Sequence, residues 1–566
     1  MEKIFSKKNI KIFNWILLIA LILVFEFGYC NVEFTTSVLT HRPSEGFYFS
    51  LCRGVVYLSI CVLMYFLNKS DIISEISNSF KNRTKNVVVI LYVIIEILAF
   101  AFYLYKFLIK QEISLVQFSI VSILLILTFV AIEYITNKYI TNIISLFLIG
   151  AVFCITVNAY HTLDEKKHFM SAYNLSYGNI DYSNPIVDKQ FMEELPRGTH
   201  YSQLVKFFKM KYQFQEGSLP EESTVDSTPA TYSPIIYIPS ALGILVGRIL
   251  QGSVADIFLM GRLFNLLAYI SLITLTIKAL PYKKKVFLIM MTIPIIMCFS
   301  STYSVDGIGV GLVSLFIAYC LKLHENKDEI KIKDLINLAI IYTLVLAFKS
   351  MSYIFVGILV FLLPLKTIFK KYKKQVPLII IGFIIANLLI LCIQPKVNLT
   401  DNRYDNVNST EQIKNVLHHP LIIIDVMMSQ VQNRLLNFNW LRDFNADAYL
   451  SSKANNVFVI MFIYYFYVAF KDDSKNFNLK EKIIMILAFV LTFGFTSGIL
   501  YVSCTPVGAI AVGGYQTRYI FPIVTLIMML LSNKTLKNQD DENFVMKITS
   551  VQVAFIALGL LGAMLK

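Results

Sequence analysis

The feature that most constrains this chain is a series of apolar segments, each close to the length that crosses a lipid bilayer. A transmembrane α-helix needs roughly 20 consecutive apolar residues, and such runs recur along most of the sequence. Hydrophobic residues make up 56% of the 566 residues and charged residues only 16%. We therefore predict an all-α, polytopic integral membrane protein with about 15 transmembrane helices, within a range of about 13 to 16.

The apolar segments are interrupted by two long polar loops, 160–255 and 395–455. We expect spans near 12–30, 48–67, 86–105, 113–135, 139–159, 256–279, 286–302, 305–321, 334–348, 351–365, 376–394, 456–470, 483–503, 517–532 and 547–565. This pattern predicts N-terminal helices of unassigned role over 1–138, a central module over 139–535, and a C-terminal transmembrane helix over 536–566.

The distribution of charge predicts which side of the membrane each loop faces. The net charge is +14, but most Lys and Arg residues lie in short loops between apolar segments, as the positive-inside rule requires, so nucleic acid is not an expected partner. The segment 232–250 decides the topology, and its prolines Pro234 and Pro239 favour a juxtamembrane helix over a clean span. The N-terminus is then cytoplasmic, and both long loops lie outside the plasma membrane of what the Lys, Ile and Asn usage suggests is a bacterium.

Several classes of site are absent from the sequence. The eight cysteines are scattered singly, without the spacing of a zinc site. No P-loop or other glycine-rich phosphate motif occurs, and nucleotides are not available on the outer face. A substrate there must carry its own leaving group or be moved by a gradient.

An acidic pair opens the first long loop. Asp164 and Glu165 follow the predicted span 139–159, and His168 comes one helical turn after Asp164, so that Asp164 and His168 share a helix face. A helix cap formed by Asp164 is the simpler interpretation of this pattern. Taken alone, the spacing favours that interpretation over a catalytic site.

Charged residues also lie within or beside later apolar segments: Arg262, Asp306, Lys349 and Arg518. A charge at the bilayer centre costs about 2.5–3.5 kcal/mol on insertion scales, so such residues are usually paired or functional. Lys349 and Arg518 have the alternative of extending to the lipid headgroups. If Arg518 instead faces a substrate, its planar guanidinium suits a phosphate group.

Six short motifs occur in order after residue 160. They are D-E-x-x-H-F-x-x-A-Y at 164–173, Y-S-P-x-x-Y-x-P-x-x-x-G at 232–243, G-R-x-x-N at 261–265, S-x-D at 304–306, K-S-M-S-Y at 349–353 and Q-x-R-Y-x-x-P at 516–522. In this order they resemble the bacterial membrane proteins catalogued as domain of unknown function 2142, over roughly 150–535. Leu163, Val305 and Thr517 depart from the residues common in that family, and none of the three replaces a charged candidate.

That family is similar to the C-class (GT-C) glycosyltransferases, which use polyprenyl-phosphate sugars on the outer face. The resemblance implies a GT-C-like fold with juxtamembrane helices in a long outer loop and an acid in the first outer loop, matched here by Asp164. It implies transfer from an undecaprenyl-phosphate sugar to a cell-envelope polysaccharide, teichoic acid or glycolipid, with inversion and with Asp164 as general base. A lipid-linked sugar flippase, or a polymerase or ligase with diphosphate-linked donors, remains an alternative.

The candidate residues divide into two groups. The catalytic candidates are Asp164 and Glu165. The substrate-binding candidates are His168, Tyr232, Tyr237, Arg262, Asp306, Lys349, Gln516, Arg518 and Tyr519. No cofactor is required by this interpretation, and a divalent metal ion between Asp164 and His168 is left open because two ligands do not make a site. The expected partners are the lipid-linked donor, the envelope acceptor and membrane lipid.

Overall fold

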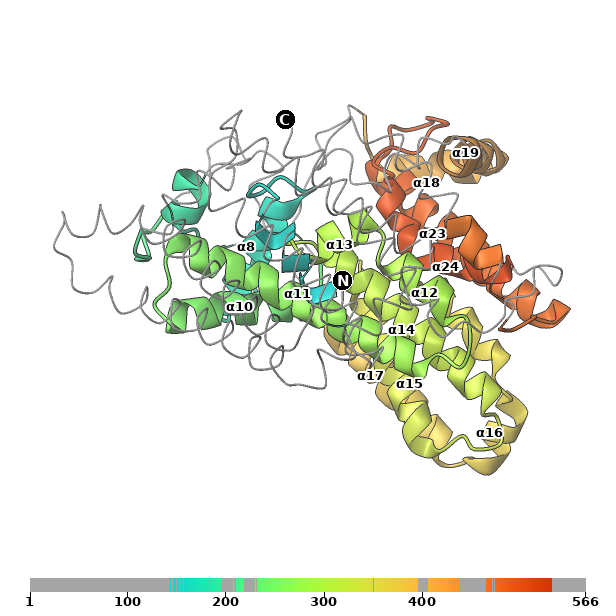
Figure 1. Ribbon diagram of the computed structural model, residues 1–566. Coiled ribbons are helices and arrows are strands. Elements are labelled where there is room, and N and C mark those ends of the chain that lie inside the picture. Colours follow the sequence, from blue (N-terminus) through green and yellow to red (C-terminus); the bar gives the residue numbers. More distant parts are fainter. Residues whose placement is uncertain are drawn as a thin grey trace, which may run out of the picture. The chain divides into compact units, whose positions relative to one another are not determined.

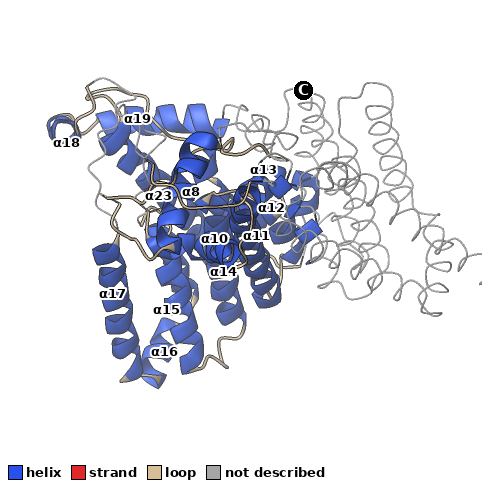
Figure 2. Cartoon of the chain, turned by 90° about the vertical axis from the view of Figure 1, so that its left-hand side faces the viewer, coloured by secondary structure: helices blue, strands red, loops and turns tan. Residues whose placement is uncertain are grey.

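The computed structural model describes most of the chain between residues 143 and 531, with its larger gaps at 196–206, 218–229, 395–405 and 437–464. The chain divides into two compact units, Met1–Leu148 and Ile149–Lys566, and the elements below belong to the second. The predicted spans before residue 139 and the span near 547–565 lie outside the described residues. Within the described part all regular elements are helices (Figure 1, Figure 2).

Four helices of the described part are long and apolar enough to cross a membrane. They are α11 (Val254–Ala279), α14 (Val305–Glu325), α17 (Gln375–Ile393) and α23 (Leu479–Cys504). All four coincide with predicted spans, which supports the prediction of a helical membrane protein. The count of about 15 transmembrane helices stays a prediction. Almost all of α14 is buried, and most of α17 is exposed, as expected for a central helix and a lipid-facing helix.

Helices α11 and α14 run parallel and form the centre of the unit. The Asn265 side-chain amide of α11 donates to the carbonyl groups of Thr302 and Ser304 at 2.8 and 3.2 Å, just before α14 begins. Seven residues further along each helix, a Cβ on Gly311 would lie 2.8 Å from the Leu272 side chain. Asn265 lies level with the start of α14, so the first three turns of α11 extend past the N-terminal end of α14.

The return between these parallel helices differs from the predicted single span 286–302. It consists of two short helices, α12 (Lys284–Met291) and α13 (Pro294–Ser300), separated at Thr292 and Ile293. Proline has no backbone N–H and disfavours a helical residue before it. Ile293 is accordingly extended, with φ −56° and ψ 136°, and Pro294 begins the second helix.

The segment that decided the predicted topology forms a short helical hairpin with α11. The 3-10 helix η4 (Pro234–Tyr237) leads into α10 (Ile238–Ile249), which packs antiparallel against the first turns of α11. A Cβ on Gly243 would lie 2.3 Å from the Met260 carbonyl oxygen. At 12 residues, α10 spans about 18 Å and is too short to cross a bilayer. Its length agrees with the predicted juxtamembrane helix, and its place relative to a membrane stays a prediction.

Six further elements of the described part surround this centre. Helices α15 (Ile332–Ala347) and α17 run side by side (Figure 2). The predicted span 351–365 is instead the 3-10 helix η5 (Ile354–Leu362), followed by α16 (Leu365–Lys371). The predicted span 517–532 begins with the 3-10 turn η8 (Thr517–Tyr519) and continues as α24 (Phe521–Leu530).

Five further helices of the described part come from the long loops, three of them α-helices and two of them short π-helices. The first loop contributes α8 (Glu165–Ser176) and the short π-helix η3 (Gln190–Glu194). The second loop contributes α18 (Ser409–His418), α19 (Ile422–Gln430) and η6 (Val431–Leu436). Helix α18 lies at the end of α23 (Figure 1), where Gln412 accepts a hydrogen bond from the Gly508 backbone at 2.9 Å.

The two ends of α14 carry different charges. Its first turn holds Asp306, and its last turn holds His324, which lies 2.7 Å from Glu481 at the start of α23. Near that second end, Lys283 pairs with Asp472 and Lys475 pairs with Glu325. The two polar levels are separated by roughly 30 Å, the thickness of a bilayer core. Which side of a membrane each level faces stays a prediction.

Replacing Gly243 with Ala should destabilise the hairpin of α10 and α11, because the new methyl group meets backbone atoms that cannot rotate away. We expect a loss of about 1–3 kcal/mol, seen as a lower melting temperature of the purified protein in detergent. Gly382→Ala in α17 is the matched control, because nothing lies within 4 Å of its added Cβ. Equal melting temperatures for the two variants would contradict the close packing.

Candidate functional site

Four charged side chains from four different elements meet at one place, which we call the charged cluster: Asp164, Asp306, Lys349 and Arg518. Arg518 Nη2 lies 2.6 Å from Asp164 Oδ2, and Arg518 Nη1 lies 3.2 Å from Asp306 Oδ2. Lys349 Nζ binds the other oxygen of Asp306. The fold thus joins residues 354 positions apart in sequence.

Asp164 does not act as a helix cap, although it stands directly before α8. It has φ 58° and ψ 14°, and its side chain makes no capping hydrogen bond. Lys349 also has a left-handed backbone, with φ 49°. This conformation costs roughly 1–3 kcal/mol for residues other than glycine and clusters at functional sites. Both residues with this backbone conformation contribute side chains to the charged cluster.

Asp306 is the buried centre of the cluster. Its side chain is 3% exposed and holds both cations, and Ser304, the N-cap of α14, donates to it at 3.3 Å. Arg518 is similarly buried, whereas the Asp164 side chain is 35% exposed. The cluster therefore has an anchored side at Asp306 and an accessible side at Asp164.

The environment shifts the pKa of three groups at this site. Burial acts to raise the pKa of Asp164, but the Arg518 guanidinium outweighs it and holds that pKa well below its ordinary value. Burial lowers the pKa of His168 to about 4, so the imidazole is neutral near pH 7. Burial, with a further contribution from Arg518, lowers the pKa of Lys349 to about 8 despite the opposing effect of Asp306.

Aromatic side chains form the wall beside the cluster. His168 Nδ1 lies 2.9 Å from the Tyr237 hydroxyl, and the His168 ring stacks on Tyr232 with centroids 5.9 Å apart. Lys349 Nζ lies 4.1 Å from the centre of the Tyr519 ring, a cation–π contact. The structure thus places the predicted residues His168, Tyr232, Tyr237 and Tyr519 beside Asp164, Asp306, Lys349 and Arg518.

Two predicted site residues occupy a different position. Glu165 and Arg262 form an ion pair of 2.8 Å, and both side chains are 0% exposed. Arg262 also donates to the carbonyl groups of Cys154, Val157 and Asn158 at 2.9, 2.7 and 3.0 Å. Because these contacts engage the guanidinium donors, Arg262 has no free pair of parallel N–H groups for a phosphate. The position of this pair fits a structural role, and the catalytic and substrate-binding interpretations of Glu165 and Arg262 are not supported by it.

Gln516 lies at the start of η8, and its side-chain carbonyl oxygen has no hydrogen-bond partner in the described structure. A residue that the sequence reasoning did not assign is Tyr353, which is fully buried and donates to the Tyr519 carbonyl group at 2.9 Å. This bond holds η8 beside Lys349. The motif K-S-M-S-Y at 349–353 could have indicated Tyr353, because this tyrosine ends the motif four residues after Lys349.

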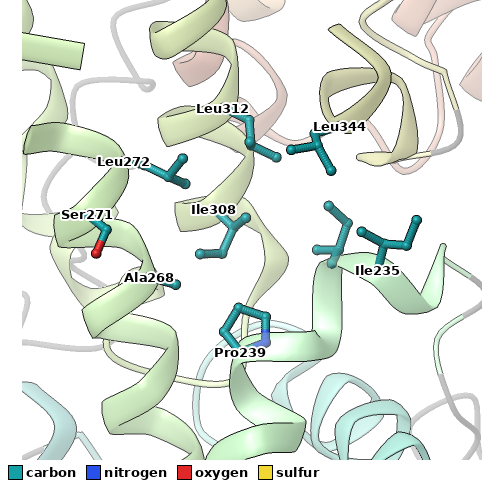
Figure 3. A pocket seen from close by; sticks show the side chains of 9 residues that line it. Ile235, Pro239, Ala268, Ser271, Leu272, Ile308, Leu312 and Leu344 are labelled. Carbon is teal, nitrogen blue, oxygen red and sulfur yellow. The ribbon is translucent and has the colours of Figure 1, made fainter. Parts of the chain in front are cut away.

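An apolar cavity of about 280 Å³ lies beside η4, the element that carries Tyr237 of the aromatic wall (Figure 3). Its lining comes from η4, α10, α11, α14 and α15, and includes Ile235, Pro239, Ala268, Leu272, Ile308 and Leu344. The lining residue Ile308 follows Asp306 by two positions, so its side chain leaves α14 on nearly the opposite face from that of Asp306. This cavity was not expected from the sequence, because its walls come from four separate segments that each look like ordinary helix packing.

No group of three or more His, Cys, Asp or Glu residues within the described ranges is arranged to hold a metal ion. The two residues considered for such an ion point to other partners, Asp164 to Arg518 and His168 to Tyr237. A metal bridge between them stays an untested alternative.

Comparison with known proteins gives one match. Residues 147–527 match the model of a family described as predicted membrane protein (DUF2142), which covers the charged cluster, the aromatic wall and the cavity. No curated protein and no solved structure matches the chain. The family resemblance expected from the ordered motifs is therefore confirmed, and the similarity to GT-C enzymes stays a prediction.

The adjacent acids Asp164 and Glu165 should respond differently to loss of charge. Glu165→Gln leaves Arg262 buried without its counter-ion and should cost about 3–5 kcal/mol of stability. Asp164→Asn alters a part-exposed pair and should change stability by about 1 kcal/mol or less. The stability of both variants is measured by the melting temperature and by the yield of monodisperse protein in detergent. The double variant Glu165→Gln, Arg262→Met removes both charges and should recover part of the stability that Glu165→Gln loses. Equal stability of the two single variants would contradict these roles.

Proposed function

Because the chain belongs to the family of predicted membrane proteins described as domain of unknown function 2142, which names no reaction, we propose a function from its site. We propose a membrane glycosyltransferase that moves a sugar from a polyprenyl-phosphate donor, of the undecaprenyl type, to a cell-envelope polysaccharide, teichoic acid or glycolipid. The reaction takes place at the outer leaflet of a bacterial plasma membrane.

The observation that carries the proposal is the charged cluster, in which the buried cations Lys349 and Arg518 lie beside the part-exposed carboxylate of Asp164 and an aromatic wall. A polyprenyl-phosphate sugar has an anionic head and a hydrocarbon tail, and the two cations match the head. Lys349 and Arg518 supply cationic donors for the phosphate. The apolar cavity beside η4 is the proposed place for the first isoprene units. Ligand sites of this kind are typically apolar with a few placed polar groups.

The position of the cluster along α14 supports an outer site. The cluster lies at the opposite end of α14 from the lysine-rich level of Lys283 and Lys475. Positive residues mark the cytoplasmic side, so the cluster faces the side without nucleotides. A donor with its own phosphate leaving group meets that requirement.

The chemistry is a single displacement at the anomeric carbon. The acceptor hydroxyl oxygen forms a bond to that carbon as the bond to the phosphate oxygen breaks, and the electron pair leaves with the lipid phosphate. The acceptor proton passes to the Asp164 carboxylate. Arg518 and Lys349 stabilise the charge that grows on the phosphate. One displacement inverts the configuration of the sugar.

Loss of the Asp164 carboxylate should abolish most of the transfer. We expect Asp164→Asn to lower the rate about 10²–10⁴-fold, the usual contribution of a general base, with normal expression. The assay follows label from an undecaprenyl-phosphate sugar into the envelope fraction of membranes that contain the protein. Glu411→Gln, in the exposed pair with Lys414, is the control for the same change of charge. Full transfer by Asp164→Asn would overturn the assignment.

The pH dependence of donor binding should report on Lys349. Its lowered pKa of about 8 means that the amine loses its charge as the pH rises through that value. We expect the donor KM to rise about tenfold between pH 7 and pH 9.5, since a charge-assisted hydrogen bond is lost. In the same window the folded chain binds fewer protons than the unfolded chain at this group, so its contribution to stability rises with pH. Deprotonation of Lys349 therefore does not unfold the protein, and unfolding does not explain the rise in the donor KM.

The matched variant for this measurement is Lys349→Arg, whose guanidinium stays charged throughout. Its KM should change little with pH, even if its value at pH 7 is higher than that of the natural chain. A KM that rises with pH to the same degree in both proteins would assign the titration to another group.

A further inference from the structure

Arg518 lies between two carboxylates that differ in accessibility. Asp306 is 3% exposed and is held by Lys349 as well, while Asp164 is 35% exposed and pairs with Arg518 alone among the ion pairs of the described residues. Displacing Asp306 would leave a buried carboxylate with one cation fewer. Displacing Asp164 returns a carboxylate to solvent at little cost. The structure thus makes Asp164 the exchangeable partner.

The donors of Arg518 are only partly used. Nη1 binds Asp306 and Nη2 binds Asp164, but the buried Nε–H has no hydrogen-bond partner within the described part of the chain. Nε and Nη2 form one edge of the planar guanidinium, the edge that binds an oxyanion through two parallel hydrogen bonds. Asp164 uses one of these two donors, and a phosphate would use both.

The acid that should accept a proton is therefore engaged in the absence of substrate. A carboxylate in a close ion pair with a guanidinium is a poor proton acceptor, because the pair stabilises its charged form. General-base catalysis is most effective when the pKa of the base lies nearer the working pH. The contact between Asp164 and Arg518 must open before Asp164 can act.

We propose that Asp164 is a latch on Arg518 that the phosphate of the donor opens. This inference rests on the proposed function. The lipid phosphate takes the Nε and Nη2 donors, displaces the Asp164 carboxylate from Nη2, and leaves it free beside the donor. Asp164 then meets the acceptor hydroxyl as an uncompensated carboxylate. The donor therefore binds first, and the base becomes competent only when there is a sugar to transfer.

Competition between Asp164 and phosphate gives a direct test with undecaprenyl monophosphate as the probe. Binding of this lipid to the full-length protein in detergent is measured at pH 7. Asp164→Asn and Asp164→Ala should each bind about fivefold more tightly than the natural chain, the effect of removing a part-exposed ion pair of about 1 kcal/mol. Glu411→Gln should leave the affinity unchanged, and Arg518→Gln should weaken it.

The outcomes separate the latch from the proposed function. If the natural chain binds the lipid and both Asp164 variants bind it equally well or more weakly, the latch is wrong while the phosphate site stands. If the natural chain and both variants fail to bind it, the latch and the proposed donor are both wrong. Tighter binding by the Asp164 variants supports the latch.

A measurement on the unmodified protein does not depend on whether the variants fold. Opening of the latch removes the tie between the start of α8 and η8. Hydrogen exchange of the first turn of α8, where the His168 amide donates to the Asp164 carbonyl group at 3.1 Å, should then become faster when undecaprenyl monophosphate is added. Slower or unchanged exchange in this turn would overturn the latch.

Discussion

The buried ion pair of Glu165 and Arg262 is the interaction on which the geometry of the site depends. It joins the first turn of α8 to α11, and through Arg262 it also binds three carbonyl groups at 154–158. The Tyr303 backbone N–H donates to Glu165 at 3.1 Å, which ties the residues just before α14 to the same pair. Removing either charge leaves the other buried without compensation, a loss of several kcal/mol. Because Asp164 precedes Glu165, this pair sets where the exposed acid stands.

The two adjacent acids show what a sequence pattern leaves open. Asp164 stands before α8 with a left-handed backbone, whereas Glu165 is the first residue of the helix, so one of two neighbouring carboxylates can be buried while the other faces a site. Asp164 and Glu165 do this, and their different roles follow from partners 354 and 97 residues away. Composition and spacing indicated that both residues were unusual. Their assignment required the position of Arg262 and Arg518 in space.

Much of the helical organisation was predictable from hydropathy, and local backbone chemistry explains the rest. Runs of apolar residues correctly predicted α11, α14, α17 and α23. Hydropathy did not distinguish the α-helix from the 3-10 helix at Ile354–Leu362, since the segment has no polar side chain that would reveal the period of the helix. The break at Ile293 was visible in principle, because Pro294 follows it. The cavity beside Ile308 was not predictable, since its shape depends on how separate helices pack.

The two anchored ends of α14 have a mechanical consequence. At one end Asp306 is bound to Lys349 and Arg518, and at the other His324 is bound to Glu481. A sliding or tilting movement of α14 would have to separate the ion pairs of Asp306 and the hydrogen bond between His324 and Glu481 together. We therefore expect α14 to stay fixed relative to the elements that it contacts at its two ends. The shorter elements beside the site, α8 and η8, are joined among the described residues by the ion pair of Asp164 and Arg518, so the proposed opening of the site is assigned to them and not to α14.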